Sequence, residues 1–169
     1  MRLTATHKIA FGAAIIYLTD QLTKLAVIRL LDYADQYIIV DGFFKFVHWG
    51  NTGAAFSMFH GNNGLLALVS LLAVVMLVLG RRHFEMDKPL GQVATGLILG
   101  GILGNLTDRL RVGHVIDFIY FHLRQRGGGE IGFPAFNVAD SAICIGVGLL
   151  FLLSFTSEPA KPAPQDNPA

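Results

Sequence analysis

The chain has 169 residues, enough for one domain, and its composition suits a protein that is surrounded by lipid. Hydrophobic residues make up 53% of it and charged residues only 15%, whereas a soluble domain carries about 25% charged residues. The formal net charge of +1 gives no indication of a nucleic-acid partner. The single cysteine, Cys144, excludes an intramolecular disulfide and a cysteine metal site. Because it lies in an apolar run, we expect a buried structural thiol.

Four apolar segments predict four transmembrane helices, over residues 9–30, 65–80, 90–110 and 135–155. A helix needs about 20 apolar residues to span the hydrocarbon core, and only 65–80 is clearly short. A soluble four-helix bundle would need a charged stripe along each helix, which 65–80 and 143–155 lack. Segment 9–30 could be a cleaved signal peptide, but it has no small-residue cleavage site, which favours a retained anchor.

Residues 37–49 have a different pattern. An Asp41-Gly42 pair separates two β-prone runs, which predicts a hairpin with positive φ at both turn positions. The aromatic residues of the second run suit the membrane–water interface. We therefore predict an all-α membrane protein with four transmembrane helices and a small β-hairpin or sheet on one face of the bilayer.

The remaining connections are polar. Residues 81–88 predict a short hairpin between helices, and 111–133 predict a longer loop with a flexible glycine run at 127–129. Residues 157–169 predict a disordered, Pro-rich tail, so the folded domain is expected over 1–156. Four spans place both termini on one side, but lysines and arginines divide evenly between the two sides, so charge alone does not orient the chain.

Polar residues of the predicted helices gather toward the side opposite the termini. They are Asp20, Lys24, Asn105, Asp108, Arg109, Asn137 and Asp140, with Asn51 and Asp117 in the adjoining loops. An aspartate at a helix centre costs about 2.5–3.5 kcal/mol to insert, so such residues mark functional sites. At about 1.5 Å rise per residue, Asp140 is expected roughly 8 Å below the start of the fourth helix.

Most of these residues also have a structural interpretation. Asp20 and Lys24 are four residues apart, and we favour an ion pair that shapes the site rather than reacting in it. Asp108 and Arg109 could anchor a helix end at the interface, and the helical asparagines could join helices by hydrogen bonds. Glycines 96, 100 and 104 form a small-residue face that predicts close helix packing.

Asp117 and Asp140 have no such simple explanation. Asp117 lies in an apolar stretch, and neither acid has an opposite charge at helical spacing. If they meet in a poorly solvated cleft, the two carboxyls share one proton, and one activates water while the other protonates a scissile carbonyl. The spacing makes that meeting plausible without proving it.

Other functions are weighed against this one. No His-Glu-x-x-His motif, nucleophile elbow or phosphate-binding glycine loop is present in the sequence, so we expect neither a metal nor a cofactor. A small transporter or channel subunit would also place acids and asparagines inside helices, but spread along the membrane depth or in inverted repeats. A non-catalytic membrane scaffold is a third interpretation.

Five sequence blocks, taken together and in order, resemble the lipoprotein signal peptidase (signal peptidase II) family over residues 9–155. They are DQLTK at 20–24, NTGAAF at 51–56, GNLTDR at 104–109, VIDF at 115–118 and FNVADS at 136–141. The stretch 124–132 is longer and richer in glycine than the family pattern.

The resemblance implies an intramembrane aspartyl endopeptidase that removes the signal peptide of prolipoproteins just before a diacylglyceryl-modified cysteine. It places the catalytic pair at Asp117 and Asp140. The residues that line or brace the site would be Asn51, Gly53, Asn105, Asp108, Arg109, Asn137, Ala139, Asp20 and Lys24. It also implies a multi-pass protein of the bacterial cytoplasmic (inner) membrane with a periplasmic or outer-facing site and both termini in the cytoplasm. We expect a monomer in membrane lipid that needs no metal, cofactor or nucleic acid.

Overall fold

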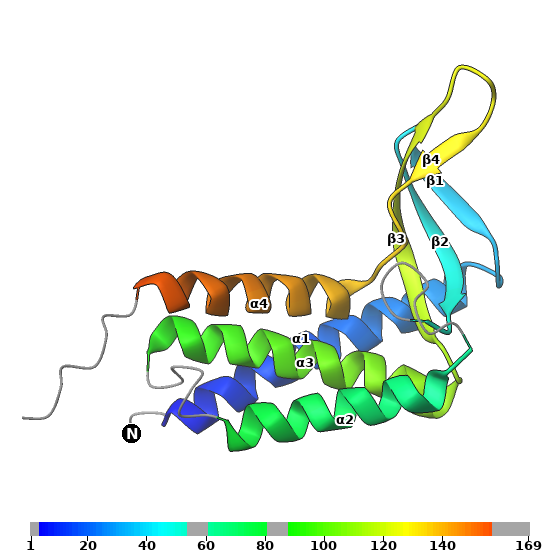
Figure 1. Cartoon of the computed structure of the whole chain (residues 1–169). Helices are drawn as coiled ribbons and strands as arrows, with labels where there is room; N and C mark the ends of the chain where they lie inside the picture. Colours follow the sequence, from blue (N-terminus) through cyan, green and yellow to red (C-terminus); the bar gives the residue numbers. More distant parts are fainter. Residues whose placement is uncertain (1–3, 54–60, 81–87, 157–169) are drawn as a thin grey trace, which may run out of the picture.

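The computed structural model describes residues 4–53, 61–80 and 88–156, in which four helices lie side by side and a sheet stands at one end of them (Figure 1). The elements in chain order are α1 (Ala5–Leu30), β1 (Gln36–Val40), β2 (Phe44–Asn51), α2 (Asn63–Leu79), α3 (Pro89–Arg111), β3 (Val115–Arg124), β4 (Glu130–Gly132) and α4 (Val138–Thr156). The start of α1 and the end of α4 lie at the end of the bundle opposite the sheet. The tail at 157–169 and nearly all of the 81–88 connection lie outside the described residues.

The exterior of the bundle is apolar. Leu22 on α1, Met76 on α2 and Phe151 on α4 each expose more than 60% of their surface. In the described part of the chain, α1, α3 and α4 are long and apolar enough to cross a membrane, while α2 is apolar but has only 17 residues. A helix with an apolar outer face is stable where its surroundings are lipid, which agrees with the composition.

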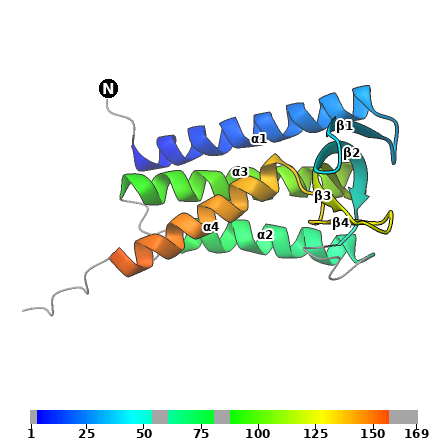
Figure 2. The same ribbon diagram turned by 90° about the horizontal axis from the view of Figure 1, so that it is seen from above.

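The centre of the bundle is α3, which lies between α1 and α2 while α4 crosses over it (Figure 2). Glycines make this close approach possible. A Cβ on Gly100 would lie 2.6 Å from the Ala13 carbonyl oxygen of α1, and one on Gly101 would lie 2.5 Å from the Ala139 carbonyl oxygen of α4. The predicted small-residue face is therefore confirmed, and α3 uses it to contact α1.

The sheet is antiparallel with strand order β1-β2-β3-β4. The predicted hairpin is confirmed, with Tyr37 opposite Phe46, but only Gly42 has a positive φ, of +72°, so the turn is not the type with two positive-φ residues. The stretch predicted as a loop instead contributes β3 and β4. We missed β3 because its buried apolar start does not alternate with polar residues, which is the usual strand signal.

The fourth helix begins later than predicted, at Val138 instead of residue 135. Phe136 pairs with β3 by exchanging backbone hydrogen bonds with Ile119, of 2.9 and 3.1 Å, which holds the chain in an extended form up to Asn137. Asp140 is consequently the third residue of the helix. It lies closer to the helix start than the predicted depth, and directly beside the sheet.

Candidate active site

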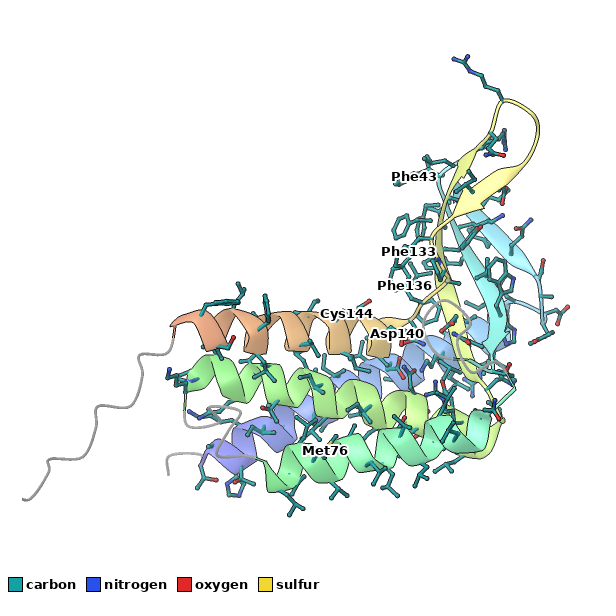
Figure 3. All side chains as sticks on the ribbon, in the orientation of Figure 1. Phe43, Met76, Phe133, Phe136, Asp140 and Cys144 are labelled. Carbon is teal, nitrogen blue, oxygen red and sulfur yellow. The ribbon has the colours of Figure 1, made fainter. Side chains whose placement is uncertain are left out.

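Asp117 near the start of β3 and Asp140 in the first turn of α4 line the same cavity, whose volume is about 790 Å³. The antiparallel pairing of β3 with β2 and the extended segment before α4 bring the two acids to the sheet end of the bundle. Figure 3 shows Asp140 where α4 meets the sheet. Phe133 and Phe136 lie above it, on the side of the sheet that faces along the helices. The structure thus brings together the two acids that the sequence left apart.

Asn137 connects the two carboxyls. Its side-chain amide donates to Asp117 Oδ1 at 2.8 Å, and its backbone N–H donates to Asp140 Oδ2 at 3.2 Å. In return, its side-chain oxygen accepts the Asp140 backbone N–H at 2.9 Å. This reciprocal pair is a capping box, so the residue that starts α4 also fixes both acids.

The other carboxylate oxygens accept from amides as well. Asn51 at the end of β2 donates to Asp117 Oδ2 at 2.9 Å, and Asn105 on α3 donates to Asp140 Oδ1 at 2.7 Å. Burial, reinforced by the nearby charge of Asp140, raises the pKa of Asp117 from 3.8 to about 7, although the bonds from Asn51 and Asn137 oppose the shift. At neutral pH this pair therefore holds a proton that an exposed aspartate would have lost.

A second group of acids is organised around a cation and contacts the first through Asn105. Lys24, only 1% exposed, donates to Asp20 Oδ2 at 2.8 Å, Asp108 Oδ2 at 2.7 Å and Asn105 Oδ1 at 2.9 Å. The predicted Asp20–Lys24 ion pair is therefore confirmed. Asp108 belongs to it and is 4% exposed, so it is not an interfacial anchor.

Asp20 also reaches the start of α4. Its Oδ1 accepts the backbone N–H of Ala139 at 2.9 Å, and Gly104 leaves the space that its carboxylate occupies. Ala139, which the sequence predicts as a site residue, is fully buried. It contributes to the site by packing behind Asp140. A residue that sequence reasoning missed, Gln21, donates from its amide to Asp108 Oδ1 at 3.0 Å and Asp20 Oδ2 at 3.2 Å. Its place beside Asp20 in the DQLTK block is the signal that could have identified it.

Arg109 and Gly53 form the remaining predicted wall. Arg109 Nη2 donates to the Gly53 carbonyl oxygen at 3.3 Å, and the Gly53 N–H donates to Asn51 Oδ1 at 2.8 Å. The Arg109 Nε is buried and has no hydrogen-bond partner among the residues that the structure describes. Arg109 lines the cavity, so this arginine and the Gly53 backbone form part of its wall.

The apolar walls were not predicted, because nothing in the sequence shows which apolar residues of distant segments face the same cavity. They consist of Trp49, Phe133, Phe136, Ile143 and Ile145, the last two on the face of α4 that carries Cys144. Cys144 is exposed and lines the cavity, so the expectation of a buried thiol is wrong: this face of α4 is not covered by another helix. Within the described ranges, no group of three or more His, Cys, Asp or Glu residues is arranged to hold a metal ion.

Comparisons with known proteins agree with the geometry. A family model described as signal peptidase (SPase) II matches residues 12–156. The lipoprotein signal peptidase of Syntrophotalea carbinolica is 39% identical over 90% of this chain and 93% of that protein, and the one of Azoarcus sp. is 41% identical over 89% and 84%. A solved structure described as a bacterial membrane enzyme superposes with a TM-score of 0.73 at 29% identity, over 92% of this chain and 93% of that one. Since these matches span most of a chain in which Asp117 and Asp140 line one cavity, the protein belongs to the signal peptidase II family.

Proposed function

We propose that the protein is an intramembrane aspartyl endopeptidase that cleaves the signal peptide from diacylglyceryl-modified prolipoproteins immediately before the lipidated cysteine. The observation that carries the proposal is the pair Asp117 and Asp140, which line one cavity and are joined through Asn137. Two carboxyls with one proton between them can hydrolyse a peptide bond without a metal.

The reaction needs both protonation states at once. The ionised carboxylate takes a proton from a water molecule as it attacks the scissile carbonyl carbon, and the protonated carboxyl donates to the carbonyl oxygen. In the collapse of the tetrahedral intermediate, the carboxyl that took the proton from water passes it to the amide nitrogen, the other carboxylate takes back the hydroxyl proton, and the C–N bond breaks. Amide donors from Asn51, Asn105 and Asn137 hold the two acids in place during these steps.

The walls suit a substrate that arrives through lipid. Ile145 and Cys144 line the cavity and are also exposed on the outer surface of α4, so the cavity is open along the side of the bundle. An acylated peptide can enter from the bilayer through this side and reach the part of the cavity that Arg109 lines. The acyl chains would remain in contact with lipid and with the apolar wall.

The membrane arrangement that we propose has α1, α2, α3 and α4 spanning the inner membrane and the sheet lying on its periplasmic surface. The short α2 fits a locally thinned bilayer. Phe133 and Phe136 on the side of the sheet facing along the helices would rest at the lipid interface (Figure 3). Both termini would then be cytoplasmic, and the protein would act as a monomer.

Cleavage of a synthetic precursor tests the activity. Purified protein in detergent is given a diacylglyceryl-modified prolipoprotein peptide, and the products are identified by mass spectrometry. We expect a single cut immediately before the modified cysteine, and no cut in the same peptide without the lipid. No cleavage of the lipidated peptide, or equal cleavage of both, would contradict the proposal.

Thiol labelling tests the orientation. In a Cys144→Ala background, Arg126→Cys between β3 and β4 should react with an impermeant reagent added outside intact cells. Lys88→Cys at the start of α3 should react only after permeabilisation. The reverse pattern would place the cavity on the face of the membrane where signal peptides are not removed.

A further inference from the structure

We infer that Lys24 is a positioning residue for the reaction: through Asn105 it holds Asp140 as the ionised member of the pair, so that Asp140 is the general base and Asp117 the acid. This inference rests on the proposed function and adds the assignment of roles within it. It also gives the buried ion group a part in catalysis beyond stabilising the fold.

The first step is the orientation of the Asn105 amide. An ammonium group can only donate hydrogen bonds, so the 2.9 Å contact with Lys24 must be made by the Asn105 oxygen. The Asn137 amide donates to the same oxygen at 3.3 Å. The Asn105 NH2 group is thereby turned toward Asp140 Oδ1, at 2.7 Å, where it stabilises a carboxylate and cannot accept a proton from a carboxylic acid.

The second step is the location of Asp140 on its helix. It is the third residue of α4, where the free backbone N–H groups and the helix dipole favour a negative charge. Its Oδ2 accepts the Asn137 backbone N–H as part of the capping box. Asp117 lies on a strand and, among the described residues, accepts only side-chain amides and no backbone N–H from the helix terminus, so the negative charge is better stabilised on Asp140.

The charged groups around Asp140 come from every element packed against it. Lys24 and Asp20 face it from α1, Asp117 faces it from β3, and Arg109 approaches both members of the pair from α3. Asp108 on α3 pairs directly with Lys24. Without Lys24, the acids Asp20 and Asp108 would lie uncompensated behind Asn105, and the Asn105 amide would be free to turn its oxygen toward Asp140.

The test measures the pH dependence of kcat/KM for the lipidated peptide, in which the acid limb reports ionisation of the base and the alkaline limb reports loss of the proton from the acid. Lys24→Met alone leaves both Asp20 and Asp108 without their cation, so it is combined with Asp20→Asn, which removes one of the two unpaired charges. Asn105→Ala is the second variant, because it leaves the ion group of Lys24, Asp20 and Asp108 intact and removes only the link to Asp140.

We expect the acid limb to move to higher pH by about one unit in the Lys24→Met/Asp20→Asn protein and in Asn105→Ala. We expect kcat to fall roughly tenfold with little change in KM, since a base is weakened and no substrate contact is lost. Combining all three substitutions should shift the limb no further than Asn105→Ala does, because Lys24 acts through Asn105.

A purely structural role for Lys24 would lower the melting temperature and the fraction of active enzyme without moving either limb. The inference would be overturned if the acid limb stays in place in Asn105→Ala, or if the shifts simply add in the combined protein. In either case, cleavage by the wild type would still support the proposed function. Absence of wild-type cleavage would overturn the proposed function itself.

Discussion

Two pairs of aspartates lie side by side at the sheet end of the bundle and have opposite surroundings. Asp20 and Asp108 share the ammonium group of Lys24, at 2.8 and 2.7 Å. Asp117 and Asp140 receive hydrogen bonds only from uncharged donors in the described structure: the side-chain amides of three asparagines and one backbone N–H.

The difference shows how one residue type acquires two roles. A cation beside a carboxylate stabilises its charged form, and the first pair uses its contacts with Lys24 to hold α1 and α3 together. Amides stabilise a carboxylate less strongly, and burial together with the neighbouring charge leaves Asp117 with a pKa of about 7. A pair that keeps a proton at neutral pH can do acid–base chemistry, which a pair neutralised by lysine cannot.

The largest expected effect comes from the pair without a cation. Asp117→Asn and Asp140→Asn should each reduce cleavage by a factor of about 10³ or more, because each removes an essential acid or base. The double variant should be scarcely worse than either single one, since the two residues act as a unit. Turnover and thermal melting are measured on the same preparations.

The matched control is Asp41→Asn. Asp41 pairs with Arg124 at the tip of the sheet, where the two side chains are 68% and 57% exposed. Exposed pairs contribute about 0–1 kcal/mol, so activity and melting should hardly change. Near-wild-type turnover in either Asp117→Asn or Asp140→Asn would refute the aspartyl mechanism.

The next largest effect is on stability, and it comes from the aspartate pair that shares the cation. Lys24→Met leaves Asp20 and Asp108 as buried anions without their partner, which should cost about 3–5 kcal/mol of stability. Adding Asp20→Asn should restore part of it, because one of the uncompensated charges is removed. Chemical or thermal unfolding of the three proteins in detergent measures this. A double variant less stable than Lys24→Met alone would show that the ion group does not stabilise the fold in this way.

A smaller effect on stability is expected in the glycine-packed middle of the bundle than at its polar end. Gly100→Ala should destabilise by about 1–3 kcal/mol, because the new Cβ would lie 2.6 Å from the backbone of α1, which cannot move easily. Gly148→Ala on α4 is the control: nothing lies within 4 Å of its Cβ position, so helix propensity should make it neutral or slightly stabilising. Equal melting temperatures for the two variants would argue against the close contact between α1 and α3.

The smallest expected effect is on the pH profile of the wild type. With the pKa of Asp117 raised to about 7, kcat/KM should fall as the pH rises through about 7, because the acid then loses its proton. The folded protein binds this proton more tightly than the unfolded chain, so Asp117 contributes stability at low pH that is lost between about pH 4 and pH 7. The measured limb belongs to the coupled pair. A rate that stays constant up to pH 9 would contradict the proton assignment.

Much of this arrangement could be predicted from the sequence, because lipid leaves a strong signal. Long apolar runs predicted the helices, and the cost of inserting charge singled out the acids and asparagines. The four-residue spacing predicted the Asp20–Lys24 pair, since it depends on one helix alone. The exposure of Cys144 could not be predicted, because an apolar run is equally compatible with facing lipid or facing a helix.

Contacts between segments that are far apart in the sequence could not be predicted either. The bond from Lys24 to Asn105 joins residues 81 positions apart, and Gln21 reaches Asp108 from 87 positions away. The strand β3 lacked the alternation that identifies a half-buried strand, so the element that carries Asp117 was predicted as a loop. Its pairing with Phe136 also delayed the start of α4 and set the depth of Asp140.

The central claim is that Asp117 gains and loses its proton near neutral pH, while the second aspartate pair forms an ion group with Lys24. Infrared difference spectroscopy follows the C=O stretching band of protonated carboxyls while the purified protein is titrated. We predict a band that disappears as the pH rises through about 7, is absent in Asp117→Asn, and is unchanged in Asp20→Asn. A band that persists in Asp117→Asn, or one that vanishes in Asp20→Asn, would contradict the account.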